Sequence, residues 1–295
     1  MDNVIVMYHY VQDNTGFKAF SKQEFREQVQ YLKERYKIIS LQELVEKKPQ
    51  GKTCVLTFDD GIKDGFTTAL PILEEEGLNG TFFVPTKIFM EKKLLGAQKR
   101  HLLLAKLGTK KFVEEFNKIA ENVFQVKKEG KKNEYDDELT SNLKFMLDNM
   151  DQRKANAILD RIFSKRFNEK EEFEKIYLSS KEVKRLVGKG MEVGSHGHAH
   201  LWLGKLPFKD MEADLVKSVE VFNNVFSMHP RVMSYPFGSY SLFTRRLAEK
   251  LGFIAAVTTA KKKNISLESP LELGRYDCID LFPRKTKEKS RKILS

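Results

Sequence analysis

The chain alternates short, uninterrupted apolar runs with longer segments whose apolar residues recur every three or four positions. The run 4–8 is typical of a buried strand, and residues 21–36 show helical spacing behind Ser21, with Glu24 placed to complete a capping box. The same order recurs, with strands expected at 53–58, 80–84, 191–194, 231–235 and 253–258, and helices at 66–76, 180–187, 209–226 and 241–251. This alternation predicts a parallel sheet, either as a barrel or doubly wound.

Between residues 88 and 177 the alternation stops, and long charged helical stretches such as 109–124 and 136–167 take its place. We therefore expect one α/β domain over residues 1–295, interrupted by a helical insertion at about residues 90–178. The segment 126–137, rich in lysine, is expected to be an exposed loop within that insertion.

At 295 residues, with 41% hydrophobic and 32% charged residues, the chain has the composition of a folded protein with a full-sized core. Its net charge of +11 would suit nucleic acid, an anionic membrane surface or a lipid-linked sugar diphosphate. The lysines are scattered as pairs along amphipathic segments, however, and no nucleic-acid-binding motif stands among them. We therefore assign most of the charge to solvated helix faces and expect no nucleic-acid partner.

Neither a membrane span nor a disulfide framework is expected. The apolar run nearest the start, 4–8, is too short for a signal-peptide core or a transmembrane helix. We therefore expect a cytoplasmic protein, with a peripheral position at a membrane as an alternative. The two cysteines, Cys54 and Cys278, each stand in a strand-like apolar stretch and are expected to be buried free thiols.

Two adjacent carboxylates, Asp59 and Asp60, directly follow the apolar run 53–58. Neighbouring negative charges at the end of a buried strand repel each other and lose hydration, so a positive partner is needed. A metal ion is the usual one. The alternative for an Asp-Asp-Gly segment alone is a solvated turn or a helix cap.

The second cluster, residues 194–200, holds three of the chain's six histidines and also ends a predicted strand. His196 and His200 are four positions apart, so on a helical turn their imidazoles would share one face and bind one cation, while His198 would point elsewhere. An ordinary capped turn is the alternative. Two histidines and a carboxylate, each at the carboxyl end of a strand, form a three-ligand site with room for water and substrate. The second carboxylate is then free to act as general base towards a metal-activated water.

The residues around both clusters resemble those of the polysaccharide deacetylase family, also called carbohydrate esterase family 4 or the NodB-homology group. The pattern is Thr-Phe-Asp-Asp-Gly at 57–61 followed by Ser-His-x-x-x-His at 195–200. The match extends to 4–9, 80–84, 192–194 and 234–238, and so covers residues 1–90 and 178 to about 280.

This resemblance implies a distorted (β/α)7 barrel with a helical insertion, whose active site lies at the carboxyl ends of the strands. It makes Asp59 the general base. The implied metal ligands are Asp60, His196 and His200. The implied lining of the acetyl pocket is the loop Tyr235, Pro236, Phe237 and Gly238. The Phe237 N–H would help to stabilise the oxyanion.

The sequence departs from the family pattern at two places. Ser234 stands where the family often has an arginine before the Pro-Phe-Gly loop. Arg275 could reach back and pair with Asp59 in its place, with a surface salt bridge as the alternative. The late Leu-x-His segment that supplies the general acid in many members is also absent. His9 closes the first predicted strand and could serve instead, or it could simply fill the rim of the barrel.

Trp202, the only tryptophan, follows His200 closely and could stack on a sugar ring, with core packing as the alternative. Asp277, beside Arg275, is a weaker candidate for substrate contact.

Together these features predict a divalent-metal-dependent hydrolase that removes an N-acetyl group from a sugar or glycan intermediate, nucleotide- or lipid-linked substrates included, in surface polysaccharide assembly. A site of two histidines and one aspartate accepts zinc, cobalt, nickel, manganese or iron, and zinc is the ion we expect first. Two other functions stay open: the same site acting on another acyl amide or ester, and a non-catalytic barrel that binds glycans or anions.

Overall fold

The structure, a computed structural model, describes residues 2–13, 19–120, 136–264 and 266–282. The chain divides into two compact units. The first comprises the described residues of Met1–Asp13, Ala19–Glu91 and Ile176–Ser295, and the second contains the described residues of Lys92–Lys175. The loop expected at 126–137 falls mostly outside the described residues.

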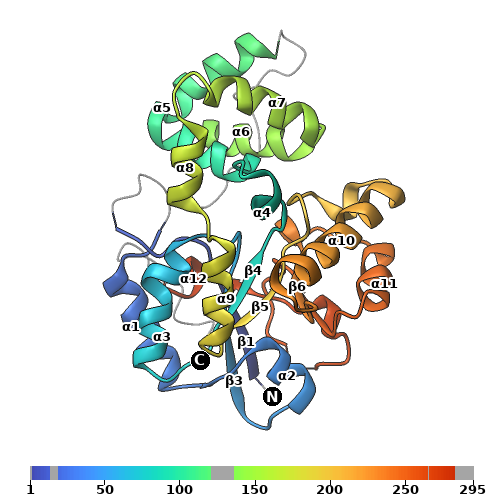
Figure 1. The fold of residues 1–295 in the computed structure, drawn as a ribbon. Helices are drawn as coiled ribbons and strands as arrows, with labels where there is room; N and C mark the ends of the chain where they lie inside the picture. Colours follow the sequence, from blue (N-terminus) through green and yellow to red (C-terminus); the bar gives the residue numbers. More distant parts are fainter. Residues whose placement is uncertain (1, 14–18, 121–135, 265, 283–295) are drawn as a thin grey trace. The chain divides into compact units, whose positions relative to one another are not determined.

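The first unit is built on one parallel sheet, whose strands lie side by side in Figure 1. Along the sheet the strands follow the order β7 (Ala255–Val257), β6 (Val232–Ser234), β5 (Glu192–Ser195), β4 (Thr81–Val84), β3 (Lys52–Phe58), β1 (Asp2–Tyr8) and β8 (Tyr276–Asp277). A further short strand, β2 (Lys37–Ile38), pairs with the amino-terminal half of β3. Within the described residues the path therefore has the seven strands expected for the barrel.

The last strand segment links the two edges of this sheet. Leu273 forms a parallel bridge to Val257 of β7, and its N–H donates to the Ala256 carbonyl at 3.0 Å. A few residues later, Tyr276 and Asp277 of β8 pair with β1. The short stretch from Leu273 to Asp277 therefore runs from the last strand to the first and curls the sheet into a distorted barrel.

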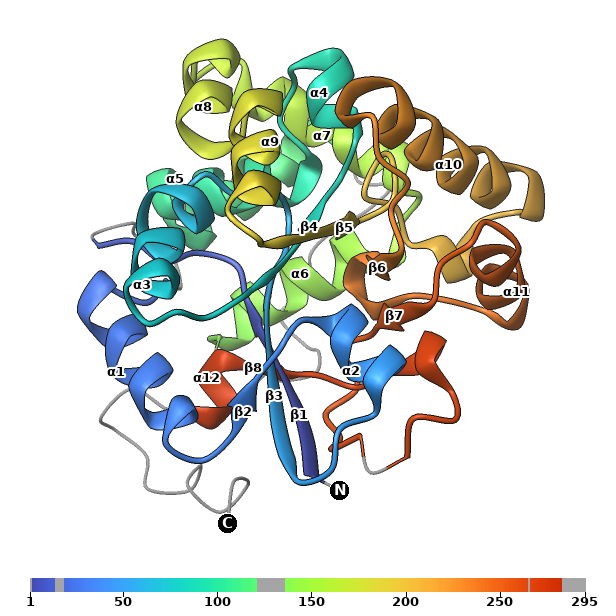
Figure 2. The ribbon, with the colours of Figure 1, turned by 60° about the horizontal axis from the view of Figure 1, so that its bottom comes forward.

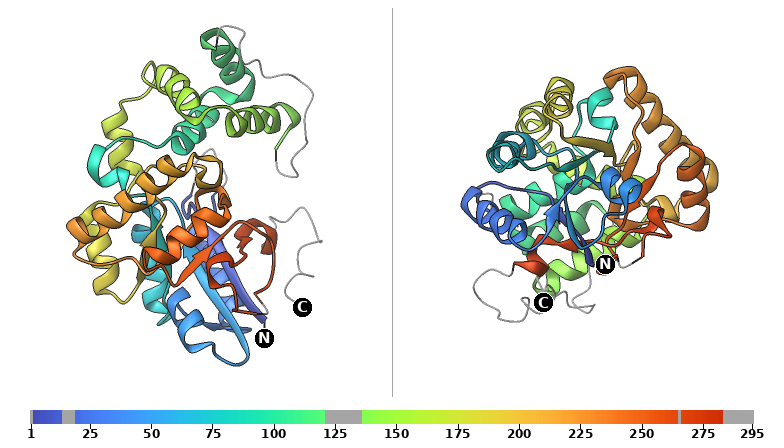
Figure 3. Two further views of the ribbon diagram at one scale, coloured as in Figure 1. Left: turned by 90° about the vertical axis from the view of Figure 1, so that its right-hand side faces the viewer. Right: turned by 90° about the horizontal axis from the view of Figure 1, so that it is seen from below.

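Helices of the first unit surround this sheet, as Figures 2 and 3 show from other sides. Those of the first unit are α1 (Lys22–Lys33), α2 (Leu41–Lys47), α3 (Leu70–Glu75), α4 (Lys87–Glu91), α9 (Ser180–Gly188), α10 (Phe208–Val221), α11 (Leu242–Lys250) and α12 (Cys278–Leu281). The capping box expected for the first helix is present, because the Ser21 side chain accepts from the Glu24 N–H and Glu24 accepts from the Ser21 N–H. Local capping thus fixes where this helix begins.

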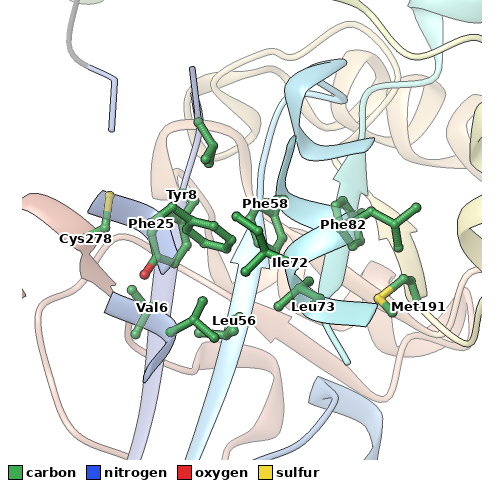
Figure 4. Close-up of a cluster of buried hydrophobic side chains, with 14 of the residues drawn as sticks. Val6, Tyr8, Phe25, Leu56, Phe58, Ile72, Leu73, Phe82, Met191 and Cys278 are labelled. Atoms are coloured by element: carbon green, nitrogen blue, oxygen red, sulfur yellow. The ribbon is translucent and has the colours of Figure 1, made fainter. Parts of the chain in front are cut away.

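Side chains alternate between the two faces of the strands, and this alternation sorts the core into separate layers. Val4, Val6 and Tyr8 of β1 pack outward with Leu56 and Phe58 of β3 against the surrounding helices. Figure 4 shows several of these outward side chains beside Phe25 of α1 and residues of α3. The intervening positions form the inner layer, whose buried members include Ile5, Val55, Phe83, Val232 and Val257. The alternation along each strand therefore decides which side chains point into the barrel.

The second unit is helical and has apolar side chains of its own in its interior. Its helices are α5 (Gly96–Ile119), α6 (Glu138–Asn149), α7 (Gln152–Phe163) and α8 (Glu169–Ile176). The single helical stretch expected at 136–167 is wrong. The helix ends before Met150, whose backbone is extended, and Asp151 then caps the start of α7. A second break occurs inside α5, where Gly108 has a φ of 69°.

Two further features concern the cysteines and the membrane. Cys54 and Cys278 are both buried free thiols, as expected, but Cys278 begins the helix α12 and does not lie in a strand. Among the described residues, none of the helices combines the length and apolar character needed to cross a membrane.

Candidate metal and catalytic centre

The two motif clusters meet at the carboxyl ends of neighbouring strands. Asp59 and Asp60 follow β3, His196 follows β5, and β4 lies between these strands. Asp59 continues the inward alternation of β3, whereas Asp60 turns into the left-handed region with a φ of 68°. That turn breaks the alternation and allows both neighbouring carboxylates to face the same end of the barrel.

Asp60, His196 and His200 bring three potential metal-binding atoms together, all within 4.8 Å of one another. Asp60 Oδ1 lies 3.3 Å from His196 Nε2 and 3.1 Å from His200 Nε2. All three side chains are buried. In a tetrahedral zinc site with bonds of about 2.0–2.1 Å, neighbouring ligand atoms stand roughly 3.3 Å apart. The separations from Asp60 Oδ1 match that spacing.

The chemistry of the set also fits a cation. His196 Nδ1 lies 2.8 Å from the Ser234 carbonyl, which can only accept, so this ring nitrogen is the donor. In a neutral imidazole the other nitrogen, Nε2, then presents a lone pair to Asp60. Without a metal, a proton on Nε2 balances the carboxylate, in line with the raised pKa of His196; with a divalent metal, neutral imidazole and carboxylate are the donors that the ion binds.

The histidine segment reaches this arrangement without a helix. Residues 196–200 are irregular, with left-handed backbone at Gly197 (φ 69°) and His200 (φ 54°). The helical turn expected here is therefore wrong, although the two imidazoles do converge. His198 points elsewhere, as expected, and its Nδ1 lies 2.9 Å from Thr86 Oγ1.

Arg275 holds Asp59 from the far end of the sequence. Its Nη1 donates to Asp59 Oδ1 and its Nη2 to Asp59 Oδ2, both at 2.8 Å, and the guanidinium is almost fully buried. Ser234 completes the group, since its hydroxyl lies 3.2 Å from Asp59 Oδ2 and accepts from Arg275 Nη2 at 2.9 Å. The ion pair is thus internal, and the Ser234 hydroxyl hydrogen-bonds to both of its members.

The charges around the centre shift its pKa values. Burial alone would raise the pKa of Asp59, but the Arg275 charge and hydrogen bonds, with His196, outweigh it and lower the pKa to about 2. Burial likewise opposes ionisation of Asp60, yet His200 and His196 lower its pKa well below the ordinary value. Burial lowers the pKa of His200. For His196, the two carboxylates outweigh burial and raise the pKa. Both carboxylates are therefore ionised at neutral pH.

His9 lies at the same end of the barrel. β1 and β3 run in register up to Tyr8 and Phe58, and the Asp59 N–H donates to the Tyr8 carbonyl at 3.0 Å. By the alternation of β1, His9 belongs on the inner face. A protonated His9 would lie near enough to lower the pKa values of Asp59 and Asp60.

The loop after β6 and Trp202 form the side of the centre next to His200. The Phe237 ring lies 4.6 Å from the His200 ring and 4.5 Å from the parallel Trp202 ring, measured between centroids. Lys205 Nζ stands 4.1 Å from the Trp202 centroid. An ammonium so close cannot share the face that Phe237 occupies, so both faces of the indole are covered. A sugar could stack on Trp202 only if Lys205 moved away.

The other loop residues contribute differently. Phe237 and Gly238 both have left-handed backbone, with φ values of 57° and 66°, and Pro236 is buried beside them. The Tyr235 side chain packs outward in the apolar layer under α10 and α11, and its hydroxyl donates to the Leu271 carbonyl at 3.1 Å. Any contact between Tyr235 and a substrate at this centre would therefore involve its backbone.

Sequence reasoning did not identify Ser234 as a partner of Asp59, nor Thr57, whose hydroxyl lies 3.1 Å from Arg275 Nη1. The alternation of inward and outward side chains along each strand could have identified them, because Thr57 and Ser234 stand at inward positions of β3 and β6. It also missed Asp64, a buried carboxylate that accepts from the Val11 N–H at 2.9 Å.

Comparisons with known proteins agree with this fold. A model of the family described as "Polysaccharide deacetylase" matches residues 46–256. Over 261 residues the chain is 22% identical to "Putative polysaccharide deacetylase YxkH" of Bacillus subtilis, a match spanning 86% of this chain but only 63% of that protein.

Solved structures resemble the fold at low identity. IcaB from Ammonifex degensii superposes with a TM-score of 0.61 at 18% identity, covering 94% of this chain and 91% of that one. Streptococcus pyogenes deacetylase PplD, solved with acetate, gives 0.59 at 17% identity, with coverages of 94% and 92%. A de-N-acetylase from Aggregatibacter actinomycetemcomitans gives 0.58 at 14% identity over the full length of both chains. Because the family model spans more than two thirds of the sequence, the chain belongs to the polysaccharide deacetylase family.

Proposed function

We propose that this protein is a divalent-metal-dependent deacetylase that removes an N-acetyl group from a sugar unit of a glycan or of a glycan intermediate. The observation that carries the proposal is the convergence of Asp60, His196 and His200 beside Asp59, whose carboxylate Arg275 holds ionised. A barrel that only binds glycans has no need of a positioned base beside a metal site. The family of the chain supports the same reaction class.

Asp60, His196 and His200 would hold the ion, and zinc suits their donor atoms best. When bound, a divalent ion supplies Lewis acidity, polarising the acyl oxygen and lowering the pKa of a water molecule. The Ser234 carbonyl fixes the orientation of the His196 ring.

Asp59 is the proposed proton acceptor. Its carboxylate is ionised at neutral pH, and its two oxygens are oriented by Arg275 and Ser234. Such positioning places the base at a fixed point next to the metal ligands, with Oδ2 3.8 Å from His196 Nε2. We assign the turn Pro236–Gly238 to the acyl group, with the Phe237 N–H as a donor to the developing oxyanion.

His9 is the proposed proton donor to the departing amine, in place of the histidine that the family often carries near the end of the chain. Its place at the inner rim, beside the strand that ends in Asp59, supports this role. Histidine is the side chain that most often serves as a general acid or base in enzymes.

The nature of the acyl group and of the substrate is drawn from the relatives. One structural neighbour is named a de-N-acetylase, and another was solved with acetate. We extend both to this chain as the proposal that it releases acetate from an N-acetylated sugar in surface polysaccharide assembly. Its cytoplasmic location and the choice between nucleotide- and lipid-linked sugars stay predictions.

The test is acetate release from N-acetylated sugars, sugar nucleotides and short oligosaccharides, measured with metal-stripped, zinc-loaded and cobalt-loaded protein. We expect release only with metal, and loss of at least about 100-fold in Asp59→Asn. Glu220→Gln, which removes a carboxylate from the exposed end of α10, is the matched control. Release that survives in Asp59→Asn would refute the assigned base. Metal binding without release from any acetylated sugar would instead favour another acyl group or a binding barrel.

A further inference from the structure

Helix α10 holds the segment that carries both histidine ligands. Asp214, on α10, accepts from the His198 N–H through Oδ2 and from the Ala199 N–H through Oδ1, both at 2.8 Å. Its side chain is buried, with 6% of the residue exposed. One carboxylate thus binds two consecutive backbone donors between His196 and His200.

A second contact from the same helix lies one turn further on. Ser218 Oγ is 2.6 Å from Ser195 Oγ, and Ser195 Oγ in turn accepts from the Gly197 N–H at 3.0 Å. The carbonyls of the segment are fixed from the opposite direction, because Gly197 and His198 accept from the N–H groups of Thr86 and Lys87. The backbone between the two ligands is therefore held on both sides.

The contacts around Gly197 leave no room for a side chain at this position. A Cβ at position 197 would stand 2.9 Å from Asp214 Oδ2, and the φ of 69° disfavours any larger residue. The segment contains no regular secondary structure that could maintain this geometry alone. Removing an acceptor would leave a part-buried N–H unsatisfied, and the backbone would relax to pair it.

We propose that Asp214, with Ser218, is a positioning residue that sets the spacing of His196 and His200 and thereby the affinity for the metal. This inference rests on the proposed function. Outer groups that orient metal ligands typically change affinity by about 10–100-fold when they are mutated. Asp214 touches neither imidazole in this role and acts only through the backbone.

The experiment compares Asp214→Asn with Glu220→Gln, a variant that removes the same charge from an exposed position of the same helix. Asparagine keeps the size but offers a single acceptor, so its NH₂ group meets one of the two N–H donors. The readouts are the zinc dissociation constant from chelator competition and the visible spectrum of the cobalt-loaded protein. We expect Asp214→Asn to weaken zinc binding by about 10–100-fold and to alter the cobalt spectrum, and Glu220→Gln to match the wild type.

A purely structural role would lower the melting temperature of Asp214→Asn but leave its zinc affinity and cobalt spectrum unchanged, and this result would overturn the inference. Should Asp214→Asn fail to fold, Ser218→Ala carries the same test, since it removes only the hydroxyl partner of Ser195; unchanged affinity there would overturn the inference equally. Failure of the proposed function looks different, because the wild-type chain itself would then bind no metal. Failure of the inference alone would leave metal binding by the wild type intact.

Discussion

At the scale of the residue, Arg275 compensates for the serine at position 234. Ser234 reaches Asp59 but carries no charge, so the cation comes from the segment that joins β7 to β1. The Ser234 hydroxyl occupies the remaining space and hydrogen-bonds both partners. The cation that pairs with Asp59 inside the barrel therefore comes from Arg275 and not from position 234.

Replacing Arg275 by methionine should destabilise the fold. The change leaves the Asp59 carboxylate buried without its cation, and breaking such a pair typically costs about 3–5 kcal/mol. Adding Asp59→Asn to Arg275→Met should restore part of that loss, because the orphaned charge disappears. Urea unfolding measures both effects. Arg231→Met, which removes an exposed arginine paired with Glu46, is the control and should cost less than about 1 kcal/mol. Equal losses for the two arginines would contradict the internal ion pair.

Asp64 should give stability a particular pH dependence. Burial raises the pKa of this carboxyl to about 7, against the hydrogen bonds from Val11 and Gly65. The unfolded chain releases the proton near pH 4 and the folded chain near pH 7, so the native state binds more protons between these values. The free energy of unfolding should therefore fall as pH rises through this window, by up to about 1.4 kcal/mol per pH unit.

Asp64→Asn removes this titration and keeps an acceptor for the Val11 N–H. Urea unfolding of the variant and the wild type across the window should show the variant gaining stability relative to the wild type as pH rises. Parallel curves would mean that Asp64 titrates at its ordinary value in the folded chain.

At the scale of the element, the site depends on how closely β5 and β6 approach. A Cβ at Gly194 of β5 would lie 2.4 Å from the Val232 carbonyl of β6 and 2.9 Å from the Phe83 ring. Only glycine fits there without moving a strand. His196 and its partner carbonyl, Ser234, stand at the ends of these same two strands, so strand spacing and ligand orientation are linked.

Gly194→Ala should therefore destabilise the fold by about 2 kcal/mol or more and also weaken zinc binding. Gly188→Ala is the matched control, because Gly188 ends α9 with no heavy atom in reach of a Cβ. Alanine is favoured over glycine in a helix, so this control should be neutral or stabilising by up to about 1 kcal/mol. Thermal unfolding and chelator competition test both variants, and normal zinc affinity in Gly194→Ala would separate the strand contact from the site.

At the scale of the whole molecule, metal binding should be coupled to the stability of the barrel. The proposed ligands come from two strands that are far apart in the sequence, so an unfolded chain cannot present them together. Zinc at 100 times its dissociation constant should add about 2.7 kcal/mol to the free energy of unfolding.

Calorimetry with and without a chelator measures this stabilisation. Asp60→Asn should show little of it, whereas Asp59→Asn should retain it, because Asp59 is not among the proposed ligands. A wild-type melting temperature that is the same with and without zinc would refute the metal site. The reverse pattern in the two variants would exchange the roles of the two aspartates.

The sequence by itself determined most of the strands and helices and the donor atoms of the candidate site. Local patterns decide where strands of this chain run and where helices begin, as the Ser21 capping box shows, and the Asp-Asp and His-x-x-x-His segments name the donor atoms. Those patterns failed at two places. At Met150 the helical spacing on both sides hid the cap that Asp151 provides for α7. At residues 196–200 the imidazoles converge through left-handed backbone at Gly197 and His200 and without a helical turn.

Only the tertiary structure decided which distant residues meet. The pairing of Arg275 with Asp59 depends on the segment that closes the sheet between β7 and β1, and the support of the histidine segment by Asp214 depends on how α10 packs. The sequence did not decide whether Trp202 is free to stack on a sugar; in the fold, Phe237 and Lys205 cover the two faces of its ring. Such contacts join residues far apart along the chain, and their energies arise from burial and close approach, which no local pattern of polar and apolar positions encodes.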